Sequence, residues 1–206
     1  MAFRPLLDFL FPAQCASCSS LGSGFCDACA SHRETIRVAF PGLRVTAYGA
    51  YERSLRSAIL ALKDGRRDVA QALGRLAATL IPAASTIVPV PTTAKRRRVR
   101  GLDGVALVAQ CAASITGAAF RPALTQCGGA QQGRTRTERL AARGRFSCTP
   151  INVAAGPILL FDDVCTTGAT LRDCADAVRE AGGRVEDAVV IAATKTAAPW
   201  GAPTLN

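Results

Sequence analysis

Two adjacent carboxylates, Asp162 and Asp163, lie between an apolar run at residues 158–161 and a turn rich in hydroxyl groups and glycine. Glycine permits a backbone in which successive N–H groups converge on one anion at the positive end of the helix dipole. Ionised acids beside such a cradle accept hydrogen bonds from the hydroxyls of a ribose or help to hold a hydrated Mg²⁺. The pattern predicts a sugar-phosphate site in which the two acids are catalytic. The residues expected to bind phosphate are Cys165, Thr166, Thr167, Gly168, Ala169 and Thr170.

Two other interpretations of this segment are weaker. A P-loop requires a lysine after its last glycine, whereas Ala169 and Thr170 follow Gly168. A strand, turn and helix without any ligand remain the alternative, but adjacent aspartates beside an apolar strand are costly without a ligand or partner. We therefore expect a binding site here.

A second chemical pattern is a group of four cysteines near the N-terminus. The pairs Cys15-x2-Cys18 and Cys26-x2-Cys29 are separated by seven residues, and two such pairs suit four thiolates around one tetrahedral Zn²⁺. We expect this zinc to be structural, with redox-active or metal-free thiols as the alternatives. His32, the sole histidine, is expected to be an ordinary surface residue. The other cysteines are expected to act as small hydrophobic residues: Cys111, Cys127, Cys148, Cys165 and Cys174.

The chain carries a formal net charge of +10, which favours a polyanionic partner such as a phosphorylated sugar, a nucleic acid or an acidic protein surface. Basic residues gather at positions 95–100 and 134–145. Both clusters are expected near the phosphate cradle, where cations stabilise a departing pyrophosphate. A path for single-stranded nucleic acid is the competing interpretation, but aromatic residues make up only 5% of the chain.

The rest of the chain alternates strand and helix patterns, which predicts an α/β fold with a parallel sheet flanked by helices. Residues 126–150 form a long polar stretch, expected to be disordered, a lid or a binding element. The predicted strands are 44–50, 86–90, 118–124, 158–161 and 185–193, and the predicted helices are 51–63, 67–80, 102–115 and 168–181.

The 206 residues, 49% of them hydrophobic, suffice for one sizeable core with a small appendage. We expect a four-cysteine zinc-knuckle segment at residues 1–38 and the α/β domain at 39–206. No apolar run reaches the length of a membrane span and no signal peptide is evident, so a cytoplasmic location is expected.

Residues 159–170 resemble the phosphoribosyl-pyrophosphate (PRPP) motif of type I phosphoribosyltransferases, and the whole chain resembles the ComF family, in which a cysteine knuckle precedes such a domain. Further similarities to that family are Tyr51-Glu52 through Lys63-x-Gly65, Val88-Pro89-Val90-Pro91, Arg97-x2-Arg100-Gly101, and Gln131 with Glu138-Arg139. The resemblance implies PRPP binding with Mg²⁺ and a link to competence and DNA uptake. Lys63, Arg97 and Arg100 are the candidate pyrophosphate ligands.

The chain also departs from the family pattern. Leu102-Asp103-Gly104 stands where Phe-Asn-Gln is common, and Ala142 stands where an asparagine is expected. Two functions remain open: a phosphoribosyltransferase, or a non-catalytic adaptor that senses PRPP or a nucleotide and binds single-stranded DNA or a DNA-processing protein. The acceptor substrate and the oligomeric state are not predicted.

Overall fold

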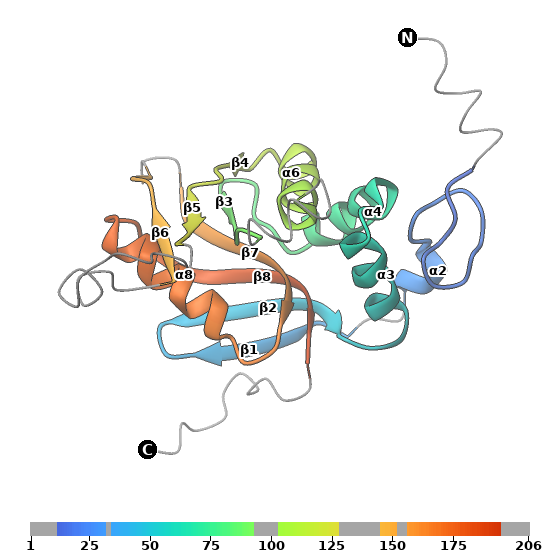
Figure 1. Cartoon of the computed structure of the whole chain (residues 1–206), viewed down its shortest axis with the longest axis horizontal. Coiled ribbons are helices and arrows are strands. Elements are labelled where there is room, and N and C mark those ends of the chain that lie inside the picture. The colour runs from blue at the N-terminus through green and yellow to red at the C-terminus, as the bar shows by residue number, and fades with distance from the viewer. Residues whose placement is uncertain (1–11, 32–33, 93–102, 128–144, 152–155, 195–206) are drawn as a thin grey trace, which may run out of the picture.

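The computed structural model describes residues 12–31, 34–92, 103–127, 145–151 and 156–194. In this part of the chain six strands form one sheet in the order β1-β2-β8-β7-β3-β4 (Figure 1). The first pair is antiparallel and every other neighbouring pair is parallel. The predicted α/β class, with a mostly parallel sheet and flanking helices, is therefore confirmed.

The helices and strands that the hydrophobic pattern predicts are present, with shifts at their ends, and β1, α2 and β6 were not predicted. The strands are β1 (Ile36–Phe40), β2 (Leu43–Ala50), β3 (Thr86–Pro89), β4 (Ala119–Phe120), β5 (Leu124–Gln126), β6 (Phe146–Cys148), β7 (Ile158–Cys165) and β8 (Val185–Ala193). The helices are α2 (Asp27–Ala30), α3 (Arg53–Lys63), α4 (Arg67–Ala78), α6 (Gly104–Thr116) and α8 (Ala169–Glu180).

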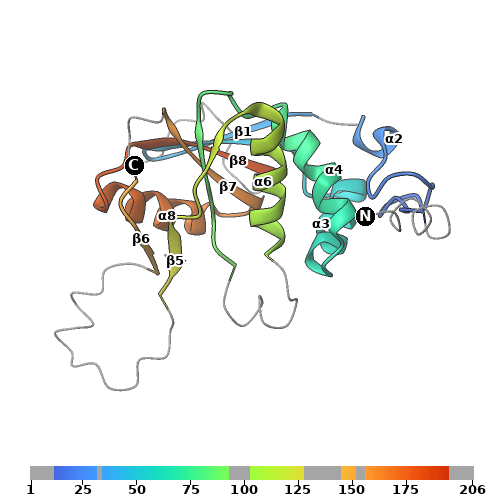
Figure 2. The same ribbon diagram turned by 90° about the horizontal axis from the view of Figure 1, so that it is seen from above.

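The two faces of the sheet carry separate hydrophobic clusters. Because successive strand side chains point to opposite faces, Leu159 and Phe161 of β7 pack in the cluster of α3, α4 and α6, whereas Ile158 and Leu160 pack in the cluster of α8. Figure 2 shows α3, α4 and α6 on one side of the molecule and α8 with β5 and β6 on the other. A strand buried on both faces must be continuously apolar, which explains the run at the start of β7.

Three details of the sheet differ from the sequence-based expectation. Strand β1 was not predicted from the sequence. The predicted strand at 118–124 is divided between β4 and β5. Strand β7 also continues through the acidic pair as far as Cys165, because β8 supplies a parallel partner along that whole length.

The long polar stretch at 126–150 is not structureless where the structure describes it. Its two ends belong to β5 and β6, which pair antiparallel with Gln126 opposite Phe146. Residues 128–144 lie outside the described residues, so the prediction of a lid stays a prediction. Pairing between distant segments cannot be read from local composition, which is why the sequence alone did not reveal this small sheet.

The division into a segment at 1–38 and a domain at 39–206 stays a prediction. Strand β1 crosses that boundary, and its pairing with β2 ties residues 36–40 to the main sheet. Within the described residues, no helix combines the length and the apolar character that a transmembrane span requires.

Candidate functional site

A pocket of about 610 Å³ opens at the carboxyl ends of the parallel strands. Strand β7 leads into α8 on one face of the sheet, and β3 is followed by α6 on the other. The strand order therefore reverses between β3 and β7, and such a switch point is where open α/β sheets bind ligands. The lining residues are Tyr51, Lys63, Val90, Pro91, Thr92, Val105, Gln126, Arg145, Phe146, Asp162, Asp163, Val164, Thr166 and Thr170.

The acidic pair lies in the second half of β7 and lines this pocket. Oδ1 of Asp162 accepts a hydrogen bond from the backbone N–H of Asp163 at 2.8 Å. Burial raises the pKa of Asp162 well above its ordinary value, and the neighbouring Asp163 carboxylate raises it further. A carboxyl group in a pocket whose pKa is perturbed by burial and by a neighbouring charge is a candidate functional group.

Lys63 lies in the last turn of α3, and its side chain contacts the acidic pair. Its Nζ lies 3.1 Å from Oδ2 of Asp163, and the two side chains are 32% and 15% exposed. The sequence predicted Lys63 as a pyrophosphate ligand, and the structure places it in the pocket. The other two predicted pyrophosphate ligands, Arg97 and Arg100, lie outside the described residues.

The predicted phosphate turn joins β7 to α8. Gly168 has a φ of +69° at the N-cap of α8, a left-handed conformation that glycine adopts without strain. A Cβ at this position would lie 2.3 Å from the Phe40 ring, so the turn also passes unusually close to β1. Both constraints explain why glycine occupies position 168.

The turn residues divide into those that face the pocket and those that shape the loop. Thr166 and Thr170 line the pocket, as the sequence predicts for phosphate ligands. Oγ1 of Thr167 instead accepts a hydrogen bond from the N–H of Ala169 at 3.4 Å. Cys165 is buried, and that burial raises the pKa of its thiol to about 11. Its side chain therefore packs in the core, and only its backbone belongs to the turn.

The small sheet adds two polar residues to the pocket, one at the end of β5 and one just before β6. Gln126 and Arg145 both line the pocket. Nε of Arg145 donates to Oδ2 of Asp173 on α8 at 2.6 Å, and its guanidinium lies 6.0 Å from the Phe146 ring centre. Arg145 belonged to a predicted basic cluster, but only the β5–β6 pairing shows that it faces the cradle. The remainder of that cluster lies outside the described residues.

Asp103, one of the departures from the family pattern, has a structural role. It is the N-cap of α6, and its Oδ1 accepts a hydrogen bond from the N–H of Ala106 at 3.1 Å. The same oxygen accepts a hydrogen bond from the hydroxyl of Thr92, also at 3.1 Å. Asp103 thus ties the segment after β3 to α6 at the pocket edge. The second departure from the pattern, at Ala142, lies outside the described residues.

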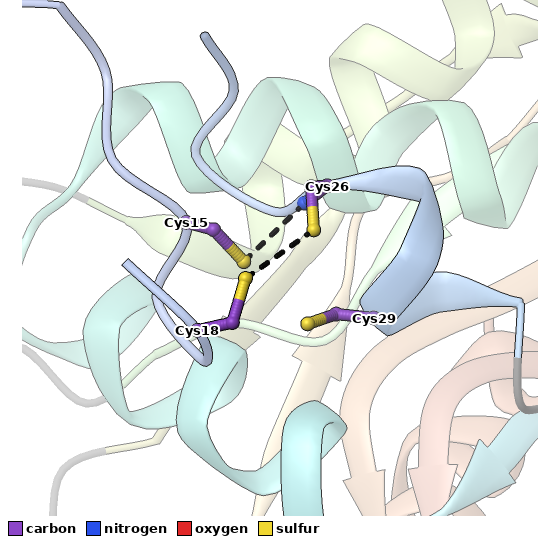
Figure 3. Close-up of side chains that lie close together, drawn as sticks. All are labelled: Cys15, Cys18, Cys26 and Cys29. Atoms are coloured by element: carbon purple, nitrogen blue, oxygen red, sulfur yellow. Dashed lines mark hydrogen bonds between the residues drawn. The ribbon is translucent and has the colours of Figure 1, made fainter. Parts of the chain in front are cut away.

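The four N-terminal cysteines converge as their spacing predicts. Their sulfur atoms all lie within 4.8 Å of one another, and Sγ of Cys18 is 3.6 Å from Sγ of Cys26 (Figure 3). A tetrahedral zinc with bonds of about 2.3 Å places its sulfur ligands about 3.8 Å apart. The cluster therefore fits a structural zinc ion, and its cysteines are free rather than disulfide-bonded.

The surroundings of the cluster lower the pKa of one cysteine and raise that of another. Burial alone would raise the pKa of Cys15, but hydrogen bonds from the backbone N–H groups of Cys18, Cys26 and Ser17 outweigh it and lower the pKa to about 6. Burial raises the pKa of Cys29 to about 12, and the neighbouring cysteines add to the rise. Four thiolates at this separation require a cation to hold them together.

The cysteine segment is packed firmly against the α/β domain. The hydroxyl of Ser54 on α3 donates to the carbonyl of Cys29 at 2.9 Å, and the Tyr48 hydroxyl donates to the carbonyl of Ala30 at 3.2 Å. Phe25 is buried in the cluster of α3 and α4. A Cβ at Gly24 would lie 2.5 Å from the backbone of α4, so glycine permits this close approach.

The remaining cysteines only partly behave as small hydrophobic residues. Cys165 and Cys174 are buried, as expected, whereas Cys111 and Cys148 are half-buried. Cys127 is exposed, which contradicts the expectation for that residue. It follows directly after β5, where the chain leaves the small sheet.

Comparison with known proteins supports the resemblance seen in the sequence motifs. No family model matches the chain. The chain is 34% identical over 97 residues to the competence protein ComFC of Bacillus subtilis (strain 168). That match covers 47% of this chain and 39% of the relative, so the chain spans well under two thirds of the relative's length. This similarity, together with the four-cysteine cluster, confirms the resemblance to the ComF family.

Among solved structures, the chain is similar to the allosteric regulatory enzyme of purine biosynthesis. The TM-score is 0.41 at 18% sequence identity, and the similarity covers 60% of this chain and 26% of that one.

Proposed function

We propose that this chain binds PRPP in the pocket between β3 and β7 and that it acts as a phosphoribosyltransferase of ComF type. The 5′-phosphate would lie on the turn before α8, bound by Thr166, Thr170 and the backbone N–H groups of the turn. Asp162 and Asp163 would hold the ribose hydroxyls. The observation that carries the proposal is that one pocket brings the acidic pair, the threonine turn and Lys63 together at a switch point of the sheet.

The pocket residues are suited to phosphoribosyl transfer. A nitrogen nucleophile would attack C1′ of PRPP, the bond from C1′ to the pyrophosphate oxygen would break, and pyrophosphate would leave with that electron pair. Remote contacts to the 5′-phosphate and ribose would position C1′. Lys63 and Arg145 would stabilise the charge on the leaving group.

Mg²⁺ would be the cofactor of this reaction, held with the pyrophosphate beside the acidic pair. Carboxylate oxygens are the ligands that Mg²⁺ takes in proteins, usually together with substrate phosphates. When bound, the ion would neutralise charge on the departing pyrophosphate. Arg97 and Arg100 remain proposed pyrophosphate ligands on the strength of the family resemblance.

We also propose that Cys15, Cys18, Cys26 and Cys29 hold one structural Zn²⁺. The separation of the sulfur atoms supports this assignment. A closed set of four thiolates leaves no open coordination position, so the zinc would stabilise the fold rather than take part in the reaction. The proposal places the chain in the cytoplasm, where cysteines stay reduced.

Calorimetric titration of PRPP with Mg²⁺ tests the proposed function. The double variant Asp162→Asn with Asp163→Asn preserves the size of both side chains and removes their charge. We expect it to lose roughly tenfold or more in PRPP affinity. A matched control is Asp176→Asn, which removes an acid of α8 that pairs with Arg179, and both of these residues lie outside the pocket lining. Equal affinity in the double variant and the wild type would refute the site.

A second candidate function follows from the similarity to a competence protein. In this alternative the chain binds PRPP or a nucleotide without turnover and carries single-stranded DNA or a DNA-uptake protein on its basic surface. The net charge of +10 supports such a partner. Pyrophosphate release from PRPP with a panel of bases would favour the enzyme. Salt-sensitive binding to single strands without pyrophosphate release would favour the adaptor.

A further inference from the structure

The ion pair between Lys63 and Asp163 occupies the position where the proposed function requires a divalent cation. Nζ of Lys63 lies 3.1 Å from Oδ2 of Asp163, and the carboxylate side chain is only 15% exposed. Water screens such a pair less than it screens a surface pair. The ammonium therefore neutralises the acid before any metal ion arrives.

Asp162, the other acid of the pair, is a poor substitute for Asp163 as a metal ligand. Oδ1 of Asp162 is engaged by the N–H of Asp163 at 2.8 Å. A divalent ion that approached the free protein would meet one acid already paired and another already hydrogen-bonded. Binding would require the Lys63 ammonium to give up its partner, and this lowers the affinity for the metal ion.

Lys63 is placed so that it can exchange one anion for another. Its backbone is fixed at the C-terminal end of α3, while its flexible side chain is 32% exposed and lines the pocket. Of the described pocket-lining residues, Lys63 and Arg145 carry positive charge, and Arg145 is already bonded to Asp173. Lys63 is paired as well, but its partner Asp163 lines the pocket whereas Asp173 does not, so movement of Lys63 would uncover a carboxylate inside the pocket.

We infer that Lys63 is a resident counter-cation that keeps divalent metal ions away from Asp163 until a phosphorylated ligand draws the ammonium to its own oxygens. Metal binding and ligand binding are then coupled through one side chain. Lys63 would then set the order in which the phosphorylated ligand and the metal ion bind. The inference rests on the proposed function for the identity of the phosphorylated ligand, but its metal component concerns the free protein alone.

Titration with Mn²⁺, followed by the electron paramagnetic resonance of the free ion, tests the inference without an activity assay. Lys63→Met keeps most of the side-chain length and removes the charge, and Lys63→Gln is a second neutral variant. Both are expected to bind Mn²⁺ roughly tenfold or more tightly than the wild type in the absence of PRPP. Lys63→Arg retains the charge and is expected to bind as weakly as the wild type.

Two further measurements identify the atoms involved. Adding Asp163→Asn to Lys63→Met is expected to abolish the gain in Mn²⁺ affinity. Adding PRPP is expected to raise the Mn²⁺ affinity of the wild type strongly and that of Lys63→Met much less, because the variant has no ammonium to move.

Neutral Lys63 variants that bind Mn²⁺ no more tightly than the folded wild type would overturn the inference. Failure of PRPP to bind any of the proteins would refute the proposed function instead. The comparison of Mn²⁺ binding in the free proteins would still decide the role of Lys63.

Discussion

At position 168 the absence of a side chain allows the phosphate turn to pass beside the Phe40 ring. The turn needs a left-handed residue, and the neighbouring strand leaves no space for a Cβ. The guanidinium of Arg172 also lies over the Phe40 ring, 5.8 Å from the ring centre. The shape of the proposed phosphate cradle therefore depends on β1, an element that the hydrophobic pattern did not reveal.

Replacement of Gly168 by alanine tests this dependence. We expect Gly168→Ala to lower the free energy of unfolding by more than the roughly 1–2 kcal/mol of left-handed strain, because the new methyl group also meets Phe40. PRPP affinity is expected to fall roughly tenfold or more, because the turn must shift to relieve the contact. Chemical denaturation and calorimetric titration measure the two effects.

Gly182 provides a matched control for that experiment. It also has a positive φ, +83°, but nothing lies within 4 Å of an added Cβ. Gly182→Ala is expected to lose only the strain energy and to bind PRPP as the wild type does. Equal PRPP affinities in the two alanine variants would show that the turn does not form the phosphate site.

On the scale of an element, the start of α6 controls one edge of the pocket. Asp103 caps the helix through Ala106 and also binds the hydroxyl of Thr92, which lines the pocket. The segment after β3 and the helix α6 are thus held together by one side chain. The departure from the family's usual asparagine keeps the capping function, because both residue types are good N-caps.

Substitution of Asp103 separates the capping role from the charge. Asp103→Ala is expected to lower the free energy of unfolding by about 1 kcal/mol and to weaken PRPP binding severalfold, because the cap and the Thr92 contact are both lost. Asp103→Asn keeps an oxygen for the Ala106 N–H and the Thr92 hydroxyl and loses the longer bond from the Thr92 N–H at 3.4 Å, so it is expected to lie closer to the wild type than the alanine variant does. Thermal denaturation and PRPP titration give the two readouts. An alanine variant as stable as the asparagine variant would contradict the assignment.

On the scale of the whole molecule, α3 connects the cysteine segment to the pocket. Ser54 near its start binds the carbonyl of Cys29, and Lys63 at its end pairs with Asp163. Figure 1 shows α2 beside α3, on the opposite side of the molecule from α8. The cysteine segment adds Phe25 to the core of the domain. Loss of its metal ion should therefore destabilise the domain as well as the segment.

Zinc removal tests whether the cysteine segment stabilises the whole domain. We expect one zinc per chain by elemental analysis and a lower melting temperature in the presence of a strong chelator, because metal binding stabilises only the folded segment. Cys18→Ser is expected to lose most of the zinc and to show the same loss of thermal stability. Cys127→Ser is the matched control, since Cys127 is also exposed but lies outside the cluster. Zinc content unaffected by Cys18→Ser would rule out the proposed ligand set.

The sequence alone determined the features that depend on local pattern. The apolar run and the acids at the end of β7, the glycine turn before α8 and the two cysteine pairs were all readable because each is contained within about a dozen residues. The order of strands and helices followed from hydrophobic periodicity for the same reason. These local signals were enough to predict the fold class and the cysteine cluster, both of which the structure confirms.

Only the tertiary structure decided which distant residues meet. The pairing of β5 with β6 brings Arg145 to the pocket, β1 restricts the phosphate turn, and the end of α3 places Lys63 on Asp163. The sequence showed Asp103 only as a departure from the family pattern, and the fold shows that it caps a helix. Such contacts join residues tens of positions apart, and they depend on strand order and packing, which no local composition encodes.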